Sequence, residues 1–226
     1  MTTPPASPGT LRAVLLDSGG VLMRPKGGRW NPRADFEQTL LAHEPSLTPE
    51  QLEQAIARGD DYLAALSATP DYHDYHRFVL RHLGVDATSR LLADLRREVP
   101  PAVYLEVFPD VEQTLQELSR RGVRMAVVSD AWPELPELHA GLGIRRYFEA
   151  YAISAVLGCT KPDPRMYHHA SSALGLAPEQ CLFVDDSPEL VAAAMGLGYA
   201  GRVLCRDSIT ADVPFVGSLT EILDLF

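Results

Sequence analysis

Three short apolar runs in this sequence end on polar residues that could do chemistry. The runs are residues 13–16, 125–128 and 181–184, and the polar residues that follow them are Asp17, Ser129, Asp130, Asp185 and Asp186. A short apolar run between turn signals predicts a strand buried on both faces, as in parallel sheets. Ligands bind beyond the carboxyl ends of such strands. We therefore expect these carboxylates and this hydroxyl to gather at one edge of one sheet.

A cation joins this set in the sequence. Lys161 lies in the loop Gly158-Cys159-Thr160-Lys161-Pro162, shortly before the third run. A carboxylate nucleophile, a hydroxyl that holds an anion, a lysine and an acid pair together indicate chemistry on a phosphate. The net charge of −10 would repel such a substrate unless a divalent cation were bound.

The elements that must position these residues alternate along residues 104–226. The pattern predicts helices at 110–121, 136–142, 164–174 and 188–195, and strands at 12–16, 123–128, 151–156, 181–185 and 202–205. Strands that alternate with helices of about 10–15 residues indicate βαβ units and a parallel sheet. The predicted fold is α/β: a doubly wound, Rossmann-like parallel sheet built from residues 11–24 and 104–226.

Residues 25–103 have a different pattern, with helical periodicity and almost no strand-like runs. Thr48-Pro49-Glu50-Gln51 has the residues of a helix start, with an N-cap, a proline and an acidic first turn. We expect an inserted helical domain here. Residues 1–10 are rich in Thr and Pro, lack the features of a signal peptide, and are expected to form a disordered tail.

Composition excludes several classes of partner. The chain has 226 residues, 46% of them apolar, and a pI near 5.1, which argues against a nucleic-acid backbone or an anionic membrane as partner. Its three scattered cysteines predict no disulfide framework. With no signal peptide and no apolar stretch of membrane-spanning length, we expect a cytoplasmic protein, either a monomer or a homodimer.

Four motifs in this order resemble the haloacid dehalogenase superfamily, in the branch with a helical C1 cap after the first motif. They are Asp17-Ser18-Gly19-Gly20-Val21-Leu22, Val127-Val128-Ser129-Asp130, Lys161-Pro162-Asp163-Pro164 and Phe183-Val184-Asp185-Asp186-Ser187. The resemblance implies that Asp17 is the nucleophile and forms an aspartyl-phosphate that water hydrolyses. A carboxylate suits this role because it is already ionised at pH 7.

The other motifs carry further implied roles. Ser129 would hydrogen-bond a phosphoryl oxygen, with backbone N–H groups at the start of a following helix as further donors. Lys161 would steady the nucleophile and the phosphate. For each of them the ordinary alternative is structural: a helix N-cap for Ser129 and a solvated loop residue for Lys161.

The resemblance also implies a Mg²⁺ cofactor. The implied protein ligands are Asp17, Asp185 and the backbone carbonyl of Gly19, which agrees with the preference of magnesium for oxygen. Asp186 is expected further out, against a metal-bound water or Lys161. Glu189 could reach such a water as well, although an acid in the first turn of a helix is an equally good explanation.

One departure concerns Gly19, which stands where most phosphatases of this family have a second aspartate that acts as acid and base. Loss of such a group typically costs about 10²–10⁴-fold in rate. Four interpretations stay open: a phosphatase with another acid or an undemanding leaving group, a dehalogenase-type hydrolase, an enzyme that moves phosphate within its substrate, and a catalytically weak binding or regulatory protein. The acid pair Asp185-Asp186 disfavours the dehalogenase.

The inserted helices would close over the nucleophile and choose the substrate. Expected substrate-binding residues are Ser18, Gly19, Asp130, Arg29, His73 and His76. The two histidines lie three apart and would share a helix face, so one of them could replace the missing acid; a hydrated helix face is the ordinary alternative. The predicted function is a Mg²⁺-dependent phosphatase that acts on a small phosphorylated metabolite.

Overall fold

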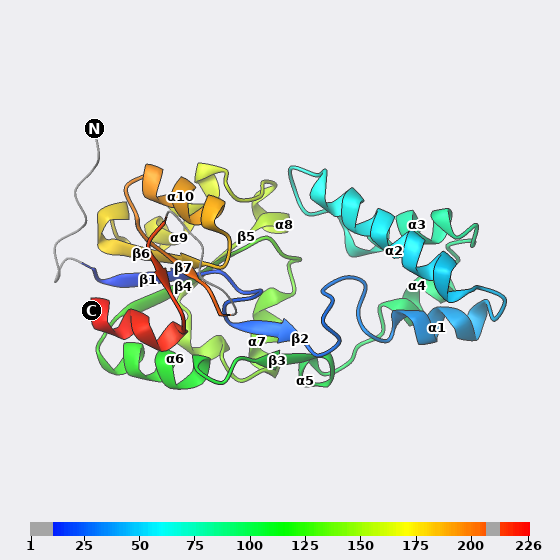
Figure 1. Ribbon diagram of the computed structural model, residues 1–226, viewed down its shortest axis with the longest axis horizontal. Coiled ribbons are helices and arrows are strands. Elements are labelled where there is room, and N and C mark those ends of the chain that lie inside the picture. The colour runs from blue at the N-terminus through cyan, green and yellow to red at the C-terminus, as the bar shows by residue number, and fades with distance from the viewer. Residues whose placement is uncertain (1–10, 207–212) are drawn as a thin grey trace.

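A single parallel sheet organises the chain in the computed structural model, which describes residues 11–206 and 213–226 (Figure 1). The strand order is β5-β4-β1-β6-β7-β8, with every neighbouring pair parallel. The strands are β1 (Ala13–Leu16), β4 (Arg124–Ser129), β5 (Ala150–Ile153), β6 (Cys181–Asp185), β7 (Ala200–Leu204) and β8 (Phe215–Val216). The tail predicted for residues 1–10 lies outside the described residues.

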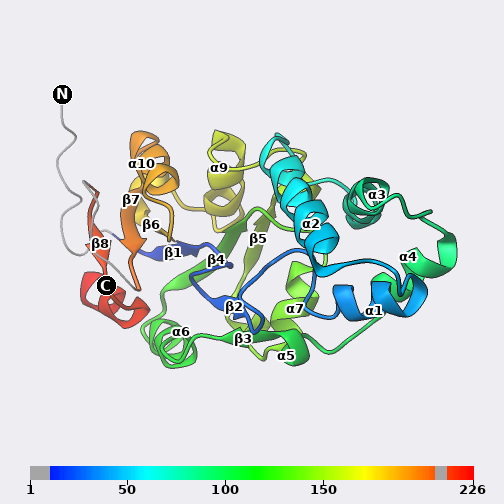
Figure 2. The same ribbon diagram turned by 45° about the vertical axis from the view of Figure 1, so that its right-hand side comes forward.

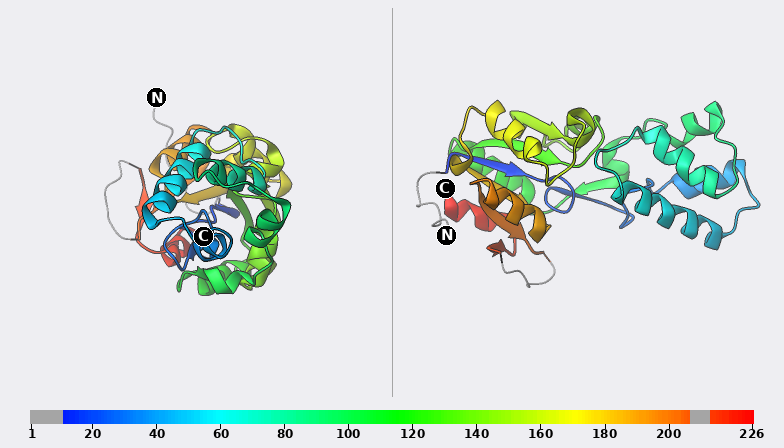
Figure 3. Two further views of the ribbon diagram at one scale, coloured as in Figure 1. Left: turned by 90° about the vertical axis from the view of Figure 1, so that its right-hand side faces the viewer. Right: turned by 90° about the horizontal axis from the view of Figure 1, so that it is seen from above.

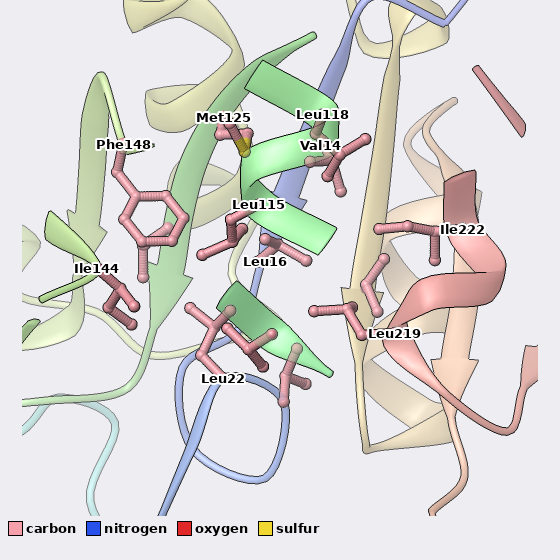
Figure 4. Close-up of a cluster of buried hydrophobic side chains, with 14 of the residues drawn as sticks. Val14, Leu16, Leu22, Leu115, Leu118, Met125, Ile144, Phe148, Leu219 and Ile222 are labelled. Carbon is pink, nitrogen blue, oxygen red and sulfur yellow. The ribbon is translucent and has the colours of Figure 1, made fainter. Parts of the chain in front are cut away.

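Helices cover both faces of this sheet because its strands are apolar on both sides (Figure 2). In β1, Ala13 and Leu15 pack toward α9 and α10, whereas Val14 and Leu16 pack toward α6 and η3. Figure 4 shows the second of these clusters. The helices and 3₁₀ turns that flank the sheet are α6 (Val111–Arg120), α7 (Leu135–Gly141), η1 (Arg145–Tyr147), α8 (Ser154–Leu157), α9 (Pro164–Ala173), η2 (Pro178–Gln180), α10 (Pro188–Gly196) and η3 (Leu219–Leu225). The predicted doubly wound parallel sheet is confirmed.

Residues 36–95 form a separate bundle, which we call the four-helix unit. It consists of α1 (Phe36–His43), α2 (Pro49–Ala64), α3 (Tyr72–His82) and α4 (Ser89–Leu95). The unit has its own buried cluster, which includes Phe36, Leu40, Tyr75 and Leu91. Thr48 begins α2 with a full capping box, as its sequence predicts. The right-hand view of Figure 3 shows the unit beyond the edge of the sheet at which β1 ends.

Two chain passages join the four-helix unit to the sheet. They pair as the short antiparallel strands β2 (Met23–Pro25) and β3 (Leu105–Val107), next to the short helix α5 (Pro101–Tyr104). Sequence periodicity did not predict these strands, because three residues are too few to show an alternation, and β2 also ends on a proline. Within the described residues, no helix has the length and apolarity needed to cross a membrane.

One predicted element differs in extent. The strand expected over residues 151–156 ends at Ile153, and α8 follows at once. The buried Ser154 hydroxyl accepts a hydrogen bond from the Ala131 N–H at 3.0 Å, which holds the chain where it turns into the helix. The apolar residues after it misled the prediction: Val156 is 64% exposed on the helix surface.

Candidate active site

The carboxyl ends of three neighbouring strands bring the predicted residues together. Asp17 follows β1, Ser129 ends β4, and Asp185 ends β6, with β1 between the other two strands. The Asp17 N–H donates to the Val184 carbonyl at 2.9 Å, which continues the β1–β6 ladder into the site. The chain passes from β1 to β4 on one side and later returns to β6 on the other, so the site lies at a topological switch point.

Lys161 connects the two buried carboxylates. Its Nζ donates to Asp17 Oδ1 at 2.6 Å and to Asp185 Oδ2 at 2.7 Å. All three side chains are less than a tenth exposed. Asp130, expected to bind substrate, lines the same cavity and accepts a hydrogen bond from the Lys161 backbone N–H at 3.0 Å. Asp130 therefore fixes the loop that delivers the lysine.

Burial and crowding set the protonation of these groups. Burial, together with the charge of Asp185, raises the pKa of Asp17 to about 7, although Lys161 acts in the opposite direction. Burial and the neighbouring Asp185 raise the pKa of Asp186 to about 6. Burial disfavours the Lys161 ammonium, but the carboxylates of Asp17, Asp185 and Asp130 outweigh it and hold its pKa above the usual value. The cluster thus carries more negative charge than one lysine neutralises.

The same cluster fits a divalent cation. Asp17, Asp185 and Asp186 offer carboxylate oxygens that all lie within 4.8 Å of one another. Such oxygens are the preferred ligands of Mg²⁺, and a cation there would remove the repulsion that raises the pKa values of Asp17 and Asp186. Asp186, predicted to lie outside the metal ligands, is the exposed member of this group, and its place in the ligand set stays a prediction.

Gly20 makes room for this third acid. Its φ is +76°, a backbone conformation that favours glycine, and a Cβ at this position would lie 2.0 Å from Asp186 Oδ2. No side chain fits there without displacing the carboxylate. The second glycine after Ser18 is therefore a requirement of the acid cluster.

Ser129 lies at the end of a strand, as expected, but the backbone after it is not the start of a helix. It is 4% exposed and lines the cavity at the end of β4. The next helix, α7, begins only at Leu135, so Ser129 is not a helix N-cap. No helix start follows it directly, so the expected row of N–H donors is not there, and the Ala131 N–H donates to the Ser154 hydroxyl.

Ser18 points into the protein. Its hydroxyl is hydrogen-bonded to His139 Nε2 at 2.8 Å, and His139 Nδ1 is hydrogen-bonded to the Tyr151 hydroxyl at 2.9 Å. Burial, with the nearby Arg145 charge, lowers the pKa of His139 to about 3, so its ring is neutral at physiological pH. This chain ties the residue next to Asp17 to α7 and β5. Sequence reasoning missed His139, because a lone histidine on a short helix gives no sign of a contact 121 positions away.

Arg206 also holds the loop that follows Asp17. Its guanidinium donates to the Gly20 and Val21 carbonyls at 3.3 and 2.9 Å and pairs with Asp110 at 2.9 Å. It also lies over the Phe108 ring, 3.9 Å from the centroid. No sequence signal marked Arg206, which follows the last strand of the predicted pattern.

A cavity of about 1580 Å³ opens from the carboxylates toward the four-helix unit. Arg29, Trp30 and His73 line it, together with Gly19. Arg29 pairs with Glu37 at 2.9 Å, while its Nε is buried without a hydrogen-bond partner among the described residues. His73 Nδ1 is also buried and unpartnered in the described part of the chain. Both predicted residues therefore line the cavity, while these two nitrogens are covered by protein atoms.

His76 needs correction. It lies on the inner face of α3, is 1% exposed, and stacks on Phe36 with ring centroids 5.6 Å apart. It does not line the cavity. Burial and the nearby positive charges of His73, Arg33 and Arg96 lower its pKa to about 3. His76 belongs to the core of the four-helix unit, because the helix turns it one face away from His73.

Glu189 also lies outside the cavity. It is an exposed acid in the first turn of α10. The ordinary explanation, an acid that favours the positive end of the helix dipole, accounts for its position.

The four-helix unit touches the sheet domain at the α2–α3 loop. Trp132 Nε1 donates to the Pro70 carbonyl at 2.6 Å, and the Thr160 N–H donates to the Ser67 carbonyl at 3.0 Å. The Trp132 ring packs edge-on against Tyr72, with centroids 4.6 Å apart. Arg96, which follows α4, forms an ion pair with Glu134. These contacts flank the cavity and hold the unit over it.

Comparison with known proteins shows similarity to one family of hydrolases. The haloacid dehalogenase-like hydrolase family matches residues 11–198. The chain is 35% identical over 99 residues to the phosphoserine phosphatase of Thermus thermophilus, which is 41% of this chain and 40% of that protein. It is 32% identical over 141 residues to an (S)-2-haloacid dehalogenase of Pseudomonas sp., 62% of this chain and 58% of that protein. The matches thus span less than two thirds of either relative.

The fold has close counterparts among solved structures. The structure of a phosphatase from Thermococcus onnurineus superposes with a TM-score of 0.64 at 20% identity and covers 94% of this chain and 96% of that one. At this identity the likeness concerns the fold alone. It extends over both the sheet domain and the four-helix unit.

Proposed function

Since this chain belongs to the haloacid dehalogenase-like hydrolases, we propose that it is a Mg²⁺-dependent phosphatase acting on a small phosphorylated metabolite. The observation that carries this proposal is the carboxylate cluster at the ends of β1 and β6, in which Asp17 and Asp185 are buried and Asp186 is exposed. One carboxylate, Asp17, is held by Lys161 next to two further acids, Asp185 and Asp186. An anionic substrate can approach three carboxylates only if positive charge is present, and the oxygens fit the cation that would supply it.

The proposed reaction has two steps. In the first, a carboxylate oxygen of Asp17 attacks phosphorus, and the bond between phosphorus and the leaving oxygen breaks. In the second, water attacks the phosphorus of the aspartyl-phosphate and releases inorganic phosphate and the Asp17 carboxylate. Lys161 stabilises charge on the nucleophile and on the transferring group throughout. Mg²⁺ held by Asp17, Asp185 and Asp186, with the Gly19 carbonyl as a further proposed ligand, would neutralise charge on the phosphoryl oxygens.

The remaining residues position these groups. Ser129 would donate its hydroxyl to a phosphoryl oxygen from the end of β4, and Asp130 holds the Lys161 loop. We assign residues 25–103 the role of a cap and residues 11–24 and 104–226 that of the catalytic core. The cap would exclude water and select the substrate, with Arg29 and His73 as its polar contacts.

A second candidate is hydrolysis of a carbon–halogen bond. It is favoured by one observation, the 32% identity to a haloacid dehalogenase. Asp17 would then attack carbon, and halide would leave without a proton. The three-carboxylate cluster argues against it, because halide displacement gives Asp185 and Asp186 no role.

The test is hydrolysis of an aryl phosphate with Mg²⁺ and with EDTA, for the wild type and Asp17→Asn. An aryl leaving group departs without a general acid, so Gly19 would not hide activity. We expect turnover that EDTA and Asp17→Asn both abolish, while the control Asp61→Asn, an exposed acid on α2, retains it. Equal turnover in Asp17→Asn would contradict the proposal, and halide release from 2-haloacids without phosphate release would favour the second candidate.

We also infer a cytoplasmic location and a monomeric or homodimeric state. Cys159 and Cys181 are buried free thiols, which suits a reducing compartment. Cell fractionation tests the location, and light scattering tests the oligomeric state.

A further inference from the structure

We propose that this site is selective for phosphates whose leaving group departs as a stabilised, planar oxyanion, such as a phenolate, an enolate or a carboxylate. Alkyl phosphates are the disfavoured class. This inference rests on the proposed phosphatase function and adds the substrate class to it. It is carried by the position of the Trp30 indole over Gly19.

The indole fills the space beside the nucleophile turn. A Cβ built on Gly19 would lie 3.0 Å from Trp30 Cζ2 and 3.4 Å from both Cε2 and Cη2. A contact of 3.0 Å is tighter than most Cβ contacts, so a side chain at this position requires the indole to shift by a few tenths of an ångström. The residue two positions after Asp17 is therefore covered by an aromatic edge, and no acidic side chain fits there unless Trp30 moves.

The other polar groups near Asp17 are already engaged. The Ser18 hydroxyl is bonded to His139, and the Lys161 ammonium donates to two carboxylates. Asp186 is packed against Gly20 within the carboxylate cluster. Ser18 and Lys161 are therefore not free to give a proton to a leaving oxygen, and the Asp186 carboxylate is the one that the proposed function assigns to the cation.

Four aromatic side chains are among the residues that line the cavity. Trp30 and Trp132 line it from loops, Tyr72 from the start of α3 and Tyr104 from α5. Aromatic rings pack well against planar, conjugated groups. A planar leaving group could therefore stack on one of these rings.

The acidity of the leaving group determines how much the missing general acid slows the reaction. When the bond between phosphorus and oxygen breaks, the leaving oxygen keeps the electron pair. A phenol has a pKa of about 10, so its anion departs unaided and takes a proton from water afterwards. An alcohol has a pKa closer to that of water, about 16, and its anion requires a proton during bond breaking. A site without a general acid forfeits about 10²–10⁴-fold on the second class and little on the first.

The experiment measures kcat/KM with Mg²⁺ for aryl phosphates of graded phenol acidity, for acetyl phosphate, for phosphoenolpyruvate and for glycerol phosphate. We expect kcat/KM to fall steeply as the leaving-group pKa rises, with glycerol phosphate at least about 100-fold below the most acidic aryl phosphate. The acetyl and enol phosphates then show which stabilised oxyanion the cavity accepts best.

Two variants test the geometric cause. Trp30→Ala with Gly19→Asp should raise glycerol phosphate turnover and flatten the dependence on leaving-group pKa, because an acid now fits beside Asp17. Trp30→Ala alone should raise KM for aryl phosphates and leave the steep dependence in place. Thermal melting of each variant checks that it is folded. If a variant does not fold, the series of substrates measured with the wild type still tests the proposal.

Three results would overturn the inference. One is a flat dependence on leaving-group pKa in the wild type. Another is a dependence that becomes steep only in His73→Ala, which would identify His73 as the missing acid. The third is no phosphate hydrolysis at all, which would remove the proposed function together with the inference. The first two leave the proposed function intact, so the failures are distinguishable.

Discussion

The two sides of the cavity are built in opposite ways. We call Asp17, Lys161, Asp185 and Asp186 the floor, and the four-helix unit with the preceding loop that carries Arg29 and Trp30 the roof. On the floor, the Lys161 and Asp185 side chains are 3% and 2% exposed and are held by short hydrogen bonds. On the roof, the Arg29 side chain is 36% exposed and Trp30 is 44% exposed, and buried polar atoms of Arg29 and His73 lack partners among the described residues. The floor is organised before any substrate arrives, which suits groups that stabilise a transition state. The roof is more exposed and less fully hydrogen-bonded, which suits groups that adjust to a substrate.

Replacing the floor lysine should have the largest effect. Lys161→Met leaves the Asp17 and Asp185 carboxylates buried without their cation. We expect kcat to fall by about 10²–10³-fold and the free energy of unfolding to fall by about 3–5 kcal/mol. The control is Lys26→Met, because Lys26 is exposed and, among the described residues, its ammonium is hydrogen-bonded to the Ala102 carbonyl alone. Equal kcat in the two variants would show that the floor is not organised by Lys161.

Gly20 tests whether the third acid belongs to the floor. Gly20→Ala would drive Asp186 out of the cluster, because the new Cβ overlaps its Oδ2. We expect about a 100-fold loss of kcat/KM and weaker Mg²⁺ activation. Gly28→Ala is the matched control: its φ is +72°, but nothing lies within 4 Å of the added Cβ. If both variants lose activity equally, backbone strain rather than Asp186 is the cause.

The roof should respond to acid through His76. Its pKa is about 3 in the fold, below the ordinary 6.5, because it is buried. Between these values the unfolded chain binds a proton that the folded chain does not, so this contribution to stability is present above pH 6.5 and lost as the pH falls toward 3. His76→Phe should therefore lose less stability between pH 7 and pH 4 than the wild type. Urea unfolding at both pH values measures it.

Tyr75→Phe is the control for this prediction. It changes a neighbouring aromatic residue of the same cluster and removes no group that titrates below pH 7, because burial holds the pKa of Tyr75 above its usual value. This variant should keep the pH dependence of the wild type. If His76→Phe keeps it as well, His76 is not the neutral buried group that the structure places in the roof.

The smallest effect is expected for a surface ion pair between the four-helix unit and the sheet domain. Arg96 and Glu134 form a partly exposed ion pair between α4 and the start of α7. Such pairs contribute at most about 1 kcal/mol. Arg96→Gln should raise KM less than about fivefold and leave kcat unchanged, as should Glu134→Gln. A large fall in kcat from either variant would mean that this pair controls closure of the cavity.

The same contrast explains what could be predicted from sequence. Asp17, Lys161 and Asp185 follow strands or motifs whose local order fixes where they lie, so the floor and the parallel sheet were foreseeable. The Ser18–His139 bond and the Arg206 clamp join segments far apart in the chain, and the Trp30 contact with Gly19 depends on how an irregular loop folds back. They leave no periodicity or motif behind. His76 was placed wrongly because a spacing of three residues cannot tell which of two histidines faces the core of the unit.

The central claim is that Asp17 is a nucleophile that carries phosphate during turnover. The direct measurement is rapid acid quenching during hydrolysis of an aryl phosphate, followed by mass spectrometry of the peptide that contains Asp17. We predict that this peptide gains one phosphoryl group in the wild type and gains none in Asp17→Asn. Turnover by the wild type with no phosphoryl group on this peptide, or with one on another residue, would contradict the account.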